Sequence, residues 1–379
     1  MSANTFGPIP GSTILSGIAG KKSIIMAANV RIATVAEGIF RAAKDTDSAV
    51  FMELARSESD LKGGYTGLTP QAFSEKMHAA AKATGFDIWA LHADHITIKK
   101  GDTAEIDGTK QLIDAQVKAG YTSFAIDASH LFNFEGKTVR EELEQNIRVT
   151  SDLARYIRQK MNGKEFGLEV EVGEIGRKDT EGLILTRPEE AVGFIKALNE
   201  NDVHPHVIAI ANGSSHGHTY DANGNVVEQL SIDIPRTKAI AQALRENNLH
   251  VGIAQHGITG TPRDLINLHF PKGDIIKGNV GTFWQDVAFG TLKIYEPALY
   301  KDIMDWTLAK YRPENPGKKD RQIIDGNCKN AIKEFFKEIY AVDEETNRAM
   351  QAMAYAESLV FFKAFGSYGT ASVIRKSLQ

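Results

Sequence analysis

Cysteine is almost absent from this sequence, in which Cys328 is the only one among 379 residues. A single thiol excludes an intrachain disulfide framework and any multi-cysteine zinc site, and it is typical of a protein in a reducing compartment. A bound metal would therefore need histidine, aspartate or glutamate ligands. We expect a cytoplasmic protein.

A strong charge of one sign and long hydrophobic runs are missing as well. The 44 Lys and Arg residues nearly balance the 48 Asp and Glu residues, which gives a formal net charge of -4. The N-terminus lacks the basic start and apolar core of a secretory signal, and no apolar run approaches the length of a membrane span. We therefore expect no nucleic-acid partner and no membrane association, and any anionic substrate has to be held by local groups.

Short runs rich in Ile, Val, Phe and Ala recur along the chain, each followed by a longer segment with helical spacing. This alternation indicates successive βα units and a parallel sheet. Eight such strands with crossover helices close most economically into a (β/α)8 TIM barrel, an α/β fold, although an open doubly wound sheet shows the same alternation. The predicted strands are 23–29, 49–54, 87–91, 123–127, 167–172, 206–210, 250–255 and 274–277.

Apolar residues three and four apart predict amphipathic helices between these strands. The clearest helices are 70–84, 108–119, 138–161, 187–199 and 234–247. From Trp284 onward the pattern is almost wholly helical, apart from a polar loop at 312–320. We predict a barrel domain at 1–299 and a helical C-terminal extension at 300–379, whose last part either covers the barrel or forms a subunit interface.

Histidines follow three of the predicted strands: His95, His216 and His256. One histidine at a strand end is more often structural than a ligand. The ends of three barrel strands meet near the barrel axis, however, and three histidines with an open fourth position are what a catalytic zinc requires. The sequence therefore predicts a site for one divalent metal, most simply Zn2+.

Glycines and carboxylates accompany these histidines. Gly217 and Gly257 let backbone N–H groups approach a ligand, as in a phosphate cradle, or they only permit tight βα turns. Glu169 and Glu171 point to the same side of a strand, where they would orient a histidine, hold a second cation or pair with Lys277. The charged, glycine-flanked segment 173–182 is either a mobile loop that brings a carboxylate over the substrate or a solvated loop.

Taken together, these motifs resemble the class II fructose-bisphosphate aldolase family from about Ser23 to about Tyr340. The combination and its order are far more specific than any one piece. The shared motifs are His92-Ala93-Asp94-His95, Ile126-Asp127-Ala128-Ser129, Leu168-Glu169-Val170-Glu171-Val172-Gly173, Gly213-Ser214-Ser215-His216-Gly217, His256-Gly257 with Thr259-Gly260, and Lys277-Gly278-Asn279.

The resemblance implies a zinc ion bound by His95, His216 and His256. It places Glu171 and Asp127 near that metal, as carboxylates that can hold it in an alternative position. Cleavage of a C–C bond beside a carbonyl leaves an enediolate, and a Lewis acid stabilises that charge without a Schiff base. The implied metal chemistry therefore agrees with the ligand types present.

Catalytic and substrate contacts are implied in the same way. Asp94 matches the acid/base residue at the C4 hydroxyl or the incoming aldehyde, and Asn279 matches the amide that hydrogen-bonds the ketose. Glu181 is our choice for the loop glutamate that moves the proton at C3, with Asp179 and Glu174 as alternatives. The predicted substrate and phosphate contacts, whose loop carbonyls in this family also hold a monovalent cation, are Asn29, Gly217, Gly257, Thr259 and Thr282.

Three departures from the family pattern fall on the phosphate contacts and leave the metal and proton chemistry intact. Where the family commonly has Asn-x-Asp-Thr, this chain has Asn279-Val280-Gly281-Thr282. Ala55, beside Arg56, replaces a phosphate-contacting serine. The usual arginine for a second phosphate is not evident near Ile323, with Arg321 only a neighbour.

The sequence therefore predicts a metal-dependent aldolase that reversibly cleaves a phosphorylated ketose, fructose 1,6-bisphosphate or a related one. The products would be dihydroxyacetone phosphate and an aldehyde such as glyceraldehyde 3-phosphate, and family precedent favours a homo-oligomer. Three alternatives stay open. They are a metal-dependent sugar epimerase, a Schiff-base aldolase using Lys277, and a barrel that serves only as a binding or assembly protein.

Overall fold

Eight parallel strands form a closed barrel in the computed structural model, which describes residues 6–177, 182–215, 217–221 and 224–378. The order around the ring is β1-β10-β9-β6-β5-β4-β3-β2, with the first and last strands paired. This closure confirms the predicted (β/α)8 barrel and rules out the open doubly wound sheet. The strands are β1 (Ile25–Asn29), β2 (Val50–Ala55), β3 (Trp89–Thr97), β4 (Ser123–Asp127), β5 (Gly167–Glu171), β6 (Val207–Ala209), β9 (Gly252–Gln255) and β10 (Ile275–Val280).

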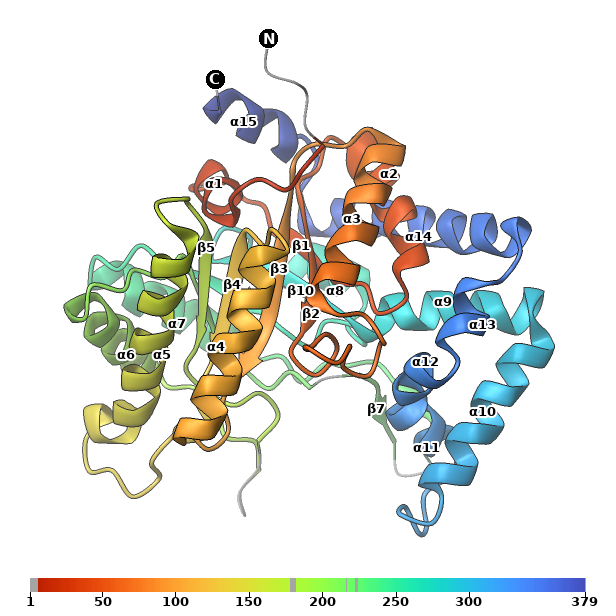
Figure 1. Cartoon of the computed structure of the whole chain (residues 1–379). Coiled ribbons are helices and arrows are strands. Elements are labelled where there is room, and N and C mark those ends of the chain that lie inside the picture. Colours follow the sequence, from red (N-terminus) through yellow and green to blue (C-terminus); the bar gives the residue numbers. More distant parts are fainter. Residues whose placement is uncertain (1–5, 178–181, 216, 222–223, 379) are drawn as a thin grey trace.

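Helices follow the barrel strands and pack on their outer side (Figure 1). They are α2 (Ala36–Asp45), α3 (Pro70–Thr84), α4 (Thr103–Lys118), α5 (Val139–Met161), α6 (Pro188–Glu200), α7 (Ile234–Glu246) and α8 (Arg263–His269). A short helix, α1 (Gly11–Gly17), precedes the barrel, and a small hairpin, β7 (Thr219–Tyr220) with β8 (Val226–Val227), follows β6.

Local sequence explains where these helices begin and end. The Thr69 side chain caps α3 by accepting a hydrogen bond from the backbone N–H of Ala72, Pro70 occupies the first turn, and Gly85 ends the helix with a φ of 65°. Helix α4 begins at Thr103, earlier than the predicted residue 108, because Asp102 provides the N-cap. The cap decides the start of this helix, and its first turns carry too few apolar residues for periodicity to reveal them.

The C-terminal part of the chain is helical, as expected, and one of its helices packs on the barrel. Helix α14 contacts α2, α8 and α9, and its residues Met350, Ala354, Phe361 and Phe362 are fully buried. This part therefore covers the barrel, one of the two arrangements left open, while the division at residue 299 stays a prediction. The helices are α9 (Thr282–Tyr295), α10 (Pro297–Tyr311), α11 (Asp320–Asn327), α12 (Ala331–Glu334), α13 (Phe336–Tyr340), α14 (Glu344–Phe365) and α15 (Thr370–Ser377).

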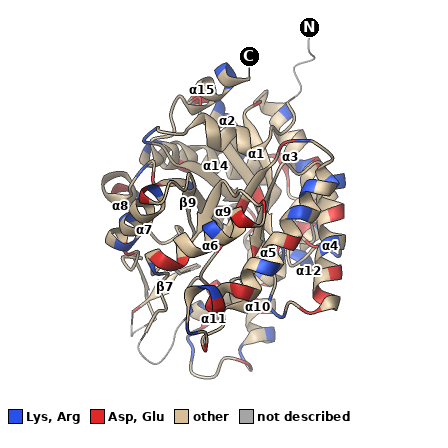
Figure 2. Ribbon diagram, turned by 90° about the vertical axis from the view of Figure 1, so that its left-hand side faces the viewer, with Lys and Arg blue, Asp and Glu red and all other residues tan. Residues whose placement is uncertain are grey.

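Acidic and basic residues are mixed along the helices on the face that Figure 2 presents, in keeping with the small net charge. Among the helices of the described residues, none combines the length and the apolar character that a membrane crossing requires.

Candidate active site

A cavity of about 900 Å3 lies at the carboxyl ends of the barrel strands, where barrel enzymes build their active sites. Loops from around the ring line it, and α11 of the C-terminal region contributes to its wall. Two predicted site residues, His216 and Glu181, lie outside the described residues. The other predicted site residues all line the cavity: Asn29, Asp94, His95, Asp127, Glu171, Gly217, His256, Gly257, Thr259, Asn279 and Thr282.

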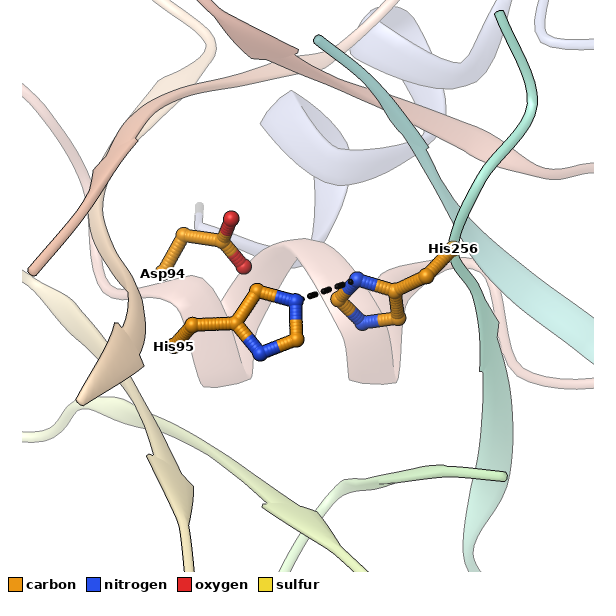
Figure 3. A group of neighbouring side chains, drawn as sticks. All are labelled: Asp94, His95 and His256. Atoms are coloured by element: carbon orange, nitrogen blue, oxygen red, sulfur yellow. Dashed lines mark hydrogen bonds between the residues drawn. The ribbon is translucent and has the colours of Figure 1, made fainter. Parts of the chain in front are cut away.

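An irregularity in β3 brings two consecutive residues, Asp94 and His95, to the same site. In a regular strand their side chains would point to opposite faces. The pairing of β3 with β4 shifts register between Ala93 and Ile96, and His95 adopts a φ of 39°, an uncommon value for a non-glycine residue. Both side chains consequently lie within reach of His256 (Figure 3). The predicted strand 87–91 ended too early because β3 continues through this irregularity to Thr97.

Two of the three predicted histidine ligands meet at this point. His95 Nε2 lies 2.9 Å from His256 Nδ1, so the two rings direct a nitrogen at the same position (Figure 3). His256 is 2% exposed. Burial and the neighbouring His95 lower the pKa of His256, which favours the neutral imidazole that a metal needs.

The other nitrogen of each ring is held by carboxylates. His256 Nε2 lies 3.0 Å from Glu169 Oε1, and His95 Nδ1 lies 3.0 Å from Glu171 Oε2 and 3.4 Å from Asp127 Oδ2. Metal-binding histidines almost always have such a partner, which fixes the tautomer and the ring orientation. The residues present therefore fit a divalent metal held by His95 Nε2 and His256 Nδ1.

A second group of candidate ligands comprises His95, Asp127 and Glu171. Burial and the nearby Asp127 carboxylate raise the pKa of Glu171 to about 8, whereas the pKa of Asp127 is lowered, despite its burial, by hydrogen bonds from His95 and Ser129. Burial opposes protonation of His95, but the carboxylates around it, Asp94 first, hold its pKa well above the usual value. Without a cation, protons thus balance the negative charge of this group.

Asp94 is a buried carboxylate with two amide donors. Asn29 Nδ2 lies 2.8 Å from Asp94 Oδ2, and Asn279 Nδ2 lies 3.1 Å from Asp94 Oδ1. Burial opposes ionisation, but the positive charges of His95 and Lys277 bring the pKa of Asp94 down to about 2. Asp94 is therefore ionised at neutral pH and can accept a proton.

Beneath the metal candidates lies a buried charged cluster of Lys277, Glu169, Glu53 and His92, each at most 3% exposed. Lys277 Nζ lies 2.9 Å from Glu169 Oε2 and 3.1 Å from Glu53 Oε2. Although burial disfavours the ammonium, Glu169 raises the pKa of Lys277. A protonated amine without solvent access is a poor nucleophile, which argues against the Schiff-base alternative. Sequence reasoning overlooked Glu53 and His92 as members of the cluster, although each is a charged or polar residue inside an apolar run.

The glycine loops are closely packed beside the histidines. A side chain at Gly257, whose φ is 65°, would come within 2.5 Å of the Ser215 carbonyl oxygen, so only glycine fits there. Thr259 Oγ1 accepts a hydrogen bond from Phe283 N at 3.2 Å, which joins this loop to the start of α9. The structure thus shows the tight turn, and Gly257 and Thr259 line the cavity.

Sequence reasoning missed a further polar group in the cavity wall. Glu58 is 2% exposed and accepts hydrogen bonds from Arg31 Nε at 2.7 Å, Tyr65 Oη at 2.8 Å and Asn29 Nδ2 at 3.1 Å. Arg31 follows the first strand closely, as several site residues follow theirs, and this position is the signal that could have identified it. Arg31, Glu58 and Tyr65 all line the cavity.

Comparison with known proteins gives this geometry a family context. Residues 11–348 match the family model described as fructose-bisphosphate aldolase class-II. A fructose-bisphosphate aldolase of Helicobacter pylori is 27% identical over 201 residues, 51% of this chain and 52% of that protein, so the match spans about half of its length. One from Nostoc sp. is 25% identical over 283 residues, 70% of this chain and 69% of that protein.

A solved structure gives the same fold. The crystal structure of fructose-bisphosphate aldolase from Campylobacter jejuni superposes with a TM-score of 0.62 at 19% identity, covering 96% of this chain and 97% of that one. The family model covers most of the sequence, including every described motif of the site. The chain therefore belongs to the class II fructose-bisphosphate aldolase family.

Proposed function

We propose that this protein is a divalent-metal-dependent aldolase that reversibly cleaves a phosphorylated ketose into dihydroxyacetone phosphate and an aldehyde. The observation that carries the proposal is the convergence of Asp94, His95 and His256, with a carboxylate behind each histidine. His216 is the third proposed ligand. The family match and the relatives named fructose-bisphosphate aldolase support this reaction class, with fructose 1,6-bisphosphate or a related ketose as substrate.

A bound Zn2+ would act as a Lewis acid that stabilises the negative charge developing on the ketose oxygens. In the cleavage direction, Asp94 takes the proton of the C4 hydroxyl, the C3–C4 bond breaks, and its electron pair remains on the three-carbon fragment as an enediolate. Asn29 and Asn279 hold the Asp94 carboxylate in place. By the family resemblance, Asn279 would also hydrogen-bond the ketose. Glu181 then returns a proton to C3, which completes dihydroxyacetone phosphate.

The remaining assignments are those that the family resemblance implies, and their residues line the cavity. Gly217, Gly257, Thr259 and Thr282 would bind the phosphate, and the loop carbonyls would hold a monovalent cation. Asp127 and Glu171 would hold the divalent metal in an alternative position near His95. We further propose that the protein acts in the cytoplasm as a homo-oligomer.

Metal analysis combined with a screen of ketose mono- and bisphosphates, with and without chelator, tests the proposal. We expect one divalent ion per chain, aldehyde release from at least one ketose phosphate, and loss of activity with the chelator that added Zn2+ restores. Full activity after complete metal removal would refute the metal mechanism. Product analysis by NMR separates the epimerase, because an epimerase releases no triose phosphate.

A matched variant links the screen to the site. Asp94→Asn keeps the shape of the side chain and removes its basicity, so it should bind the metal and lose turnover. His256→Gln should lose the metal itself. If both variants retain parental activity, the reaction does not take place at this cluster.

A further inference from the structure

The guanidinium of Arg31 is fixed in the cavity wall by three partners. Its Nε donates to Glu58 Oε1 at 2.7 Å, and its Nη1 donates to Thr282 Oγ1 at 3.2 Å and to Gln285 Oε1 at 3.1 Å. The Arg31 side chain is 12% exposed. Glu58 is itself held by Tyr65 and by the backbone N–H of Ala55. The orientation of the arginine is therefore set before any ligand arrives.

One nitrogen of this guanidinium remains available. Among the described residues, none accepts a hydrogen bond from Arg31 Nη2. A Cβ atom built on Gly281 would lie 3.4 Å from Nη2, so the missing side chain at this position leaves the space in front of it open. Arg31 and Gly281 both line the cavity. An ion pair that served only the fold would not require this opening.

The space in front of Nη2 adjoins the loops assigned to phosphate. Thr282 directly follows Gly281 and contacts Arg31, and the next residue, Phe283, donates its backbone N–H to Thr259. An arginine with a fixed plane suits phosphate recognition, because its Nη2 is already oriented to donate a charge-assisted hydrogen bond to a phosphate oxygen. An aspartate at position 281 would place a carboxylate against Nη2 and compete for the same donor.

We propose that Arg31 is a phosphate-binding residue of this protein, whose Nη2, exposed by Gly281, donates a hydrogen bond to the phosphate of the ketose held at Thr259 and Thr282. The inference rests on the proposed function for the identity of the ketose, but the binding of phosphate itself does not depend on turnover. The cation assigned to the phosphate comes from the loop after β1, and Gly281 in the loop after β10 leaves it open to the cavity.

The test compares Gly281→Asp with Gly281→Asn, which have the same size and differ in charge. Inorganic phosphate is titrated calorimetrically into the full-length, metal-loaded protein and both variants, and KM is measured for any ketose phosphate that is cleaved. The Asn variant gives the effect of filling the space. We expect Asp to weaken phosphate binding by about a further tenfold or more, the range of a charge-assisted hydrogen bond.

Arg31→Gln supplies a second measurement, with thermal unfolding as a check of the fold. It should weaken phosphate binding in the folded protein by a similar factor. Equal affinity of the Asp and Asn variants, or an unchanged phosphate affinity in a folded Arg31→Gln protein, would overturn the proposal. If the parent cleaves no ketose phosphate but Arg31→Gln still weakens phosphate binding and the Asp and Asn variants still differ, the proposed function fails while the role of Arg31 stands.

Discussion

Replacing Lys277 by methionine should destabilise the fold and impair the metal site together. Lys277 Nζ lies 2.9 Å from Glu169 Oε2, and the lysine and glutamate side chains are 1% and 3% exposed. Despite its burial, the charge of Lys277 and the hydrogen bond with His256 hold the pKa of Glu169 well below its usual value, whereas burial and Asp94 raise the pKa of Glu53. Glu169 is therefore the charged partner that the substitution would leave unpaired.

The size of the effect follows from this pairing. Breaking a buried ion pair by removing one partner costs about 3–5 kcal/mol. With an unfolding entropy of about 2.1 cal/mol/K per residue, a chain of 379 residues loses about 4–6 °C of Tm. Methionine has nearly the length of lysine, so the lost charge rather than a cavity dominates this figure.

Differential scanning calorimetry of the metal-free proteins measures the loss, and a competitive chelator titration measures the zinc affinity. Since Glu169 also contacts His256, we expect the Lys277→Met protein to bind zinc about tenfold more weakly or worse. Adding Glu169→Gln removes the unpaired charge, so the double variant should unfold at a higher temperature than Lys277→Met alone. A double variant no more stable than the single one would refute the reasoning.

Three further predictions concern proton and charge balance. Zinc affinity should rise between about pH 6 and pH 8, because the metal displaces protons from His95 and Glu171, whose pKa values are raised. A pH-independent affinity would contradict this. Asp94→Asn should lower kcat by about 10²–10⁴-fold with little change in KM or zinc content, measured by steady-state kinetics and metal analysis. Burial raises the pKa of Asp47, but hydrogen bonds from α15, including that of Arg375, outweigh burial and lower this pKa. The contact therefore stabilises the docked helix above about pH 4 and is lost as the pH falls through the lowered pKa. The protection of α15 amides from hydrogen exchange, relative to the unfolded chain at the same pH, should therefore fall on acidification, and Arg375→Gln should show low protection already at neutral pH.

The barrel was predictable from the sequence, and its irregularities were not. Apolar runs of strand length separated by helical periodicity predicted eight strands. A parallel strand that is buried on both faces needs apolar residues at nearly every position, so it appears in the sequence as a continuous apolar run. The extension of β3 to Thr97 depends on pairing with β4, which no local pattern encodes. The φ of His95 belongs to the same irregularity, and without it Asp94 and His95 would not share a site.

Some polar contacts of the site could likewise be predicted from the sequence, and others could not. Residues that follow strands, such as His256 and Asn279, were predictable because the ends of barrel strands converge. The partners of Arg31 were not, since Glu58 and Gln285 lie 27 and 254 positions away from it in the sequence. Only the family resemblance, which expects a phosphate contact near Ile323, indicated that α11 would reach the cavity; the helical pattern of the region did not.

A single buried ammonium links the two halves of the proposed chemistry. Lys277 Nζ donates to Asn279 Oδ1 at 3.1 Å, and the amide of Asn279 donates in turn to Asp94. On its other side, Lys277 pairs with Glu169, which contacts His256. A buried ion pair is a poor source of stability compared with apolar packing, so its presence calls for another reason. We infer a geometric reason. One fixed cation orients both the proposed acid/base carboxylate and a proposed metal ligand, so the barrel interior rather than its loops sets the distance between proton transfer and charge stabilisation.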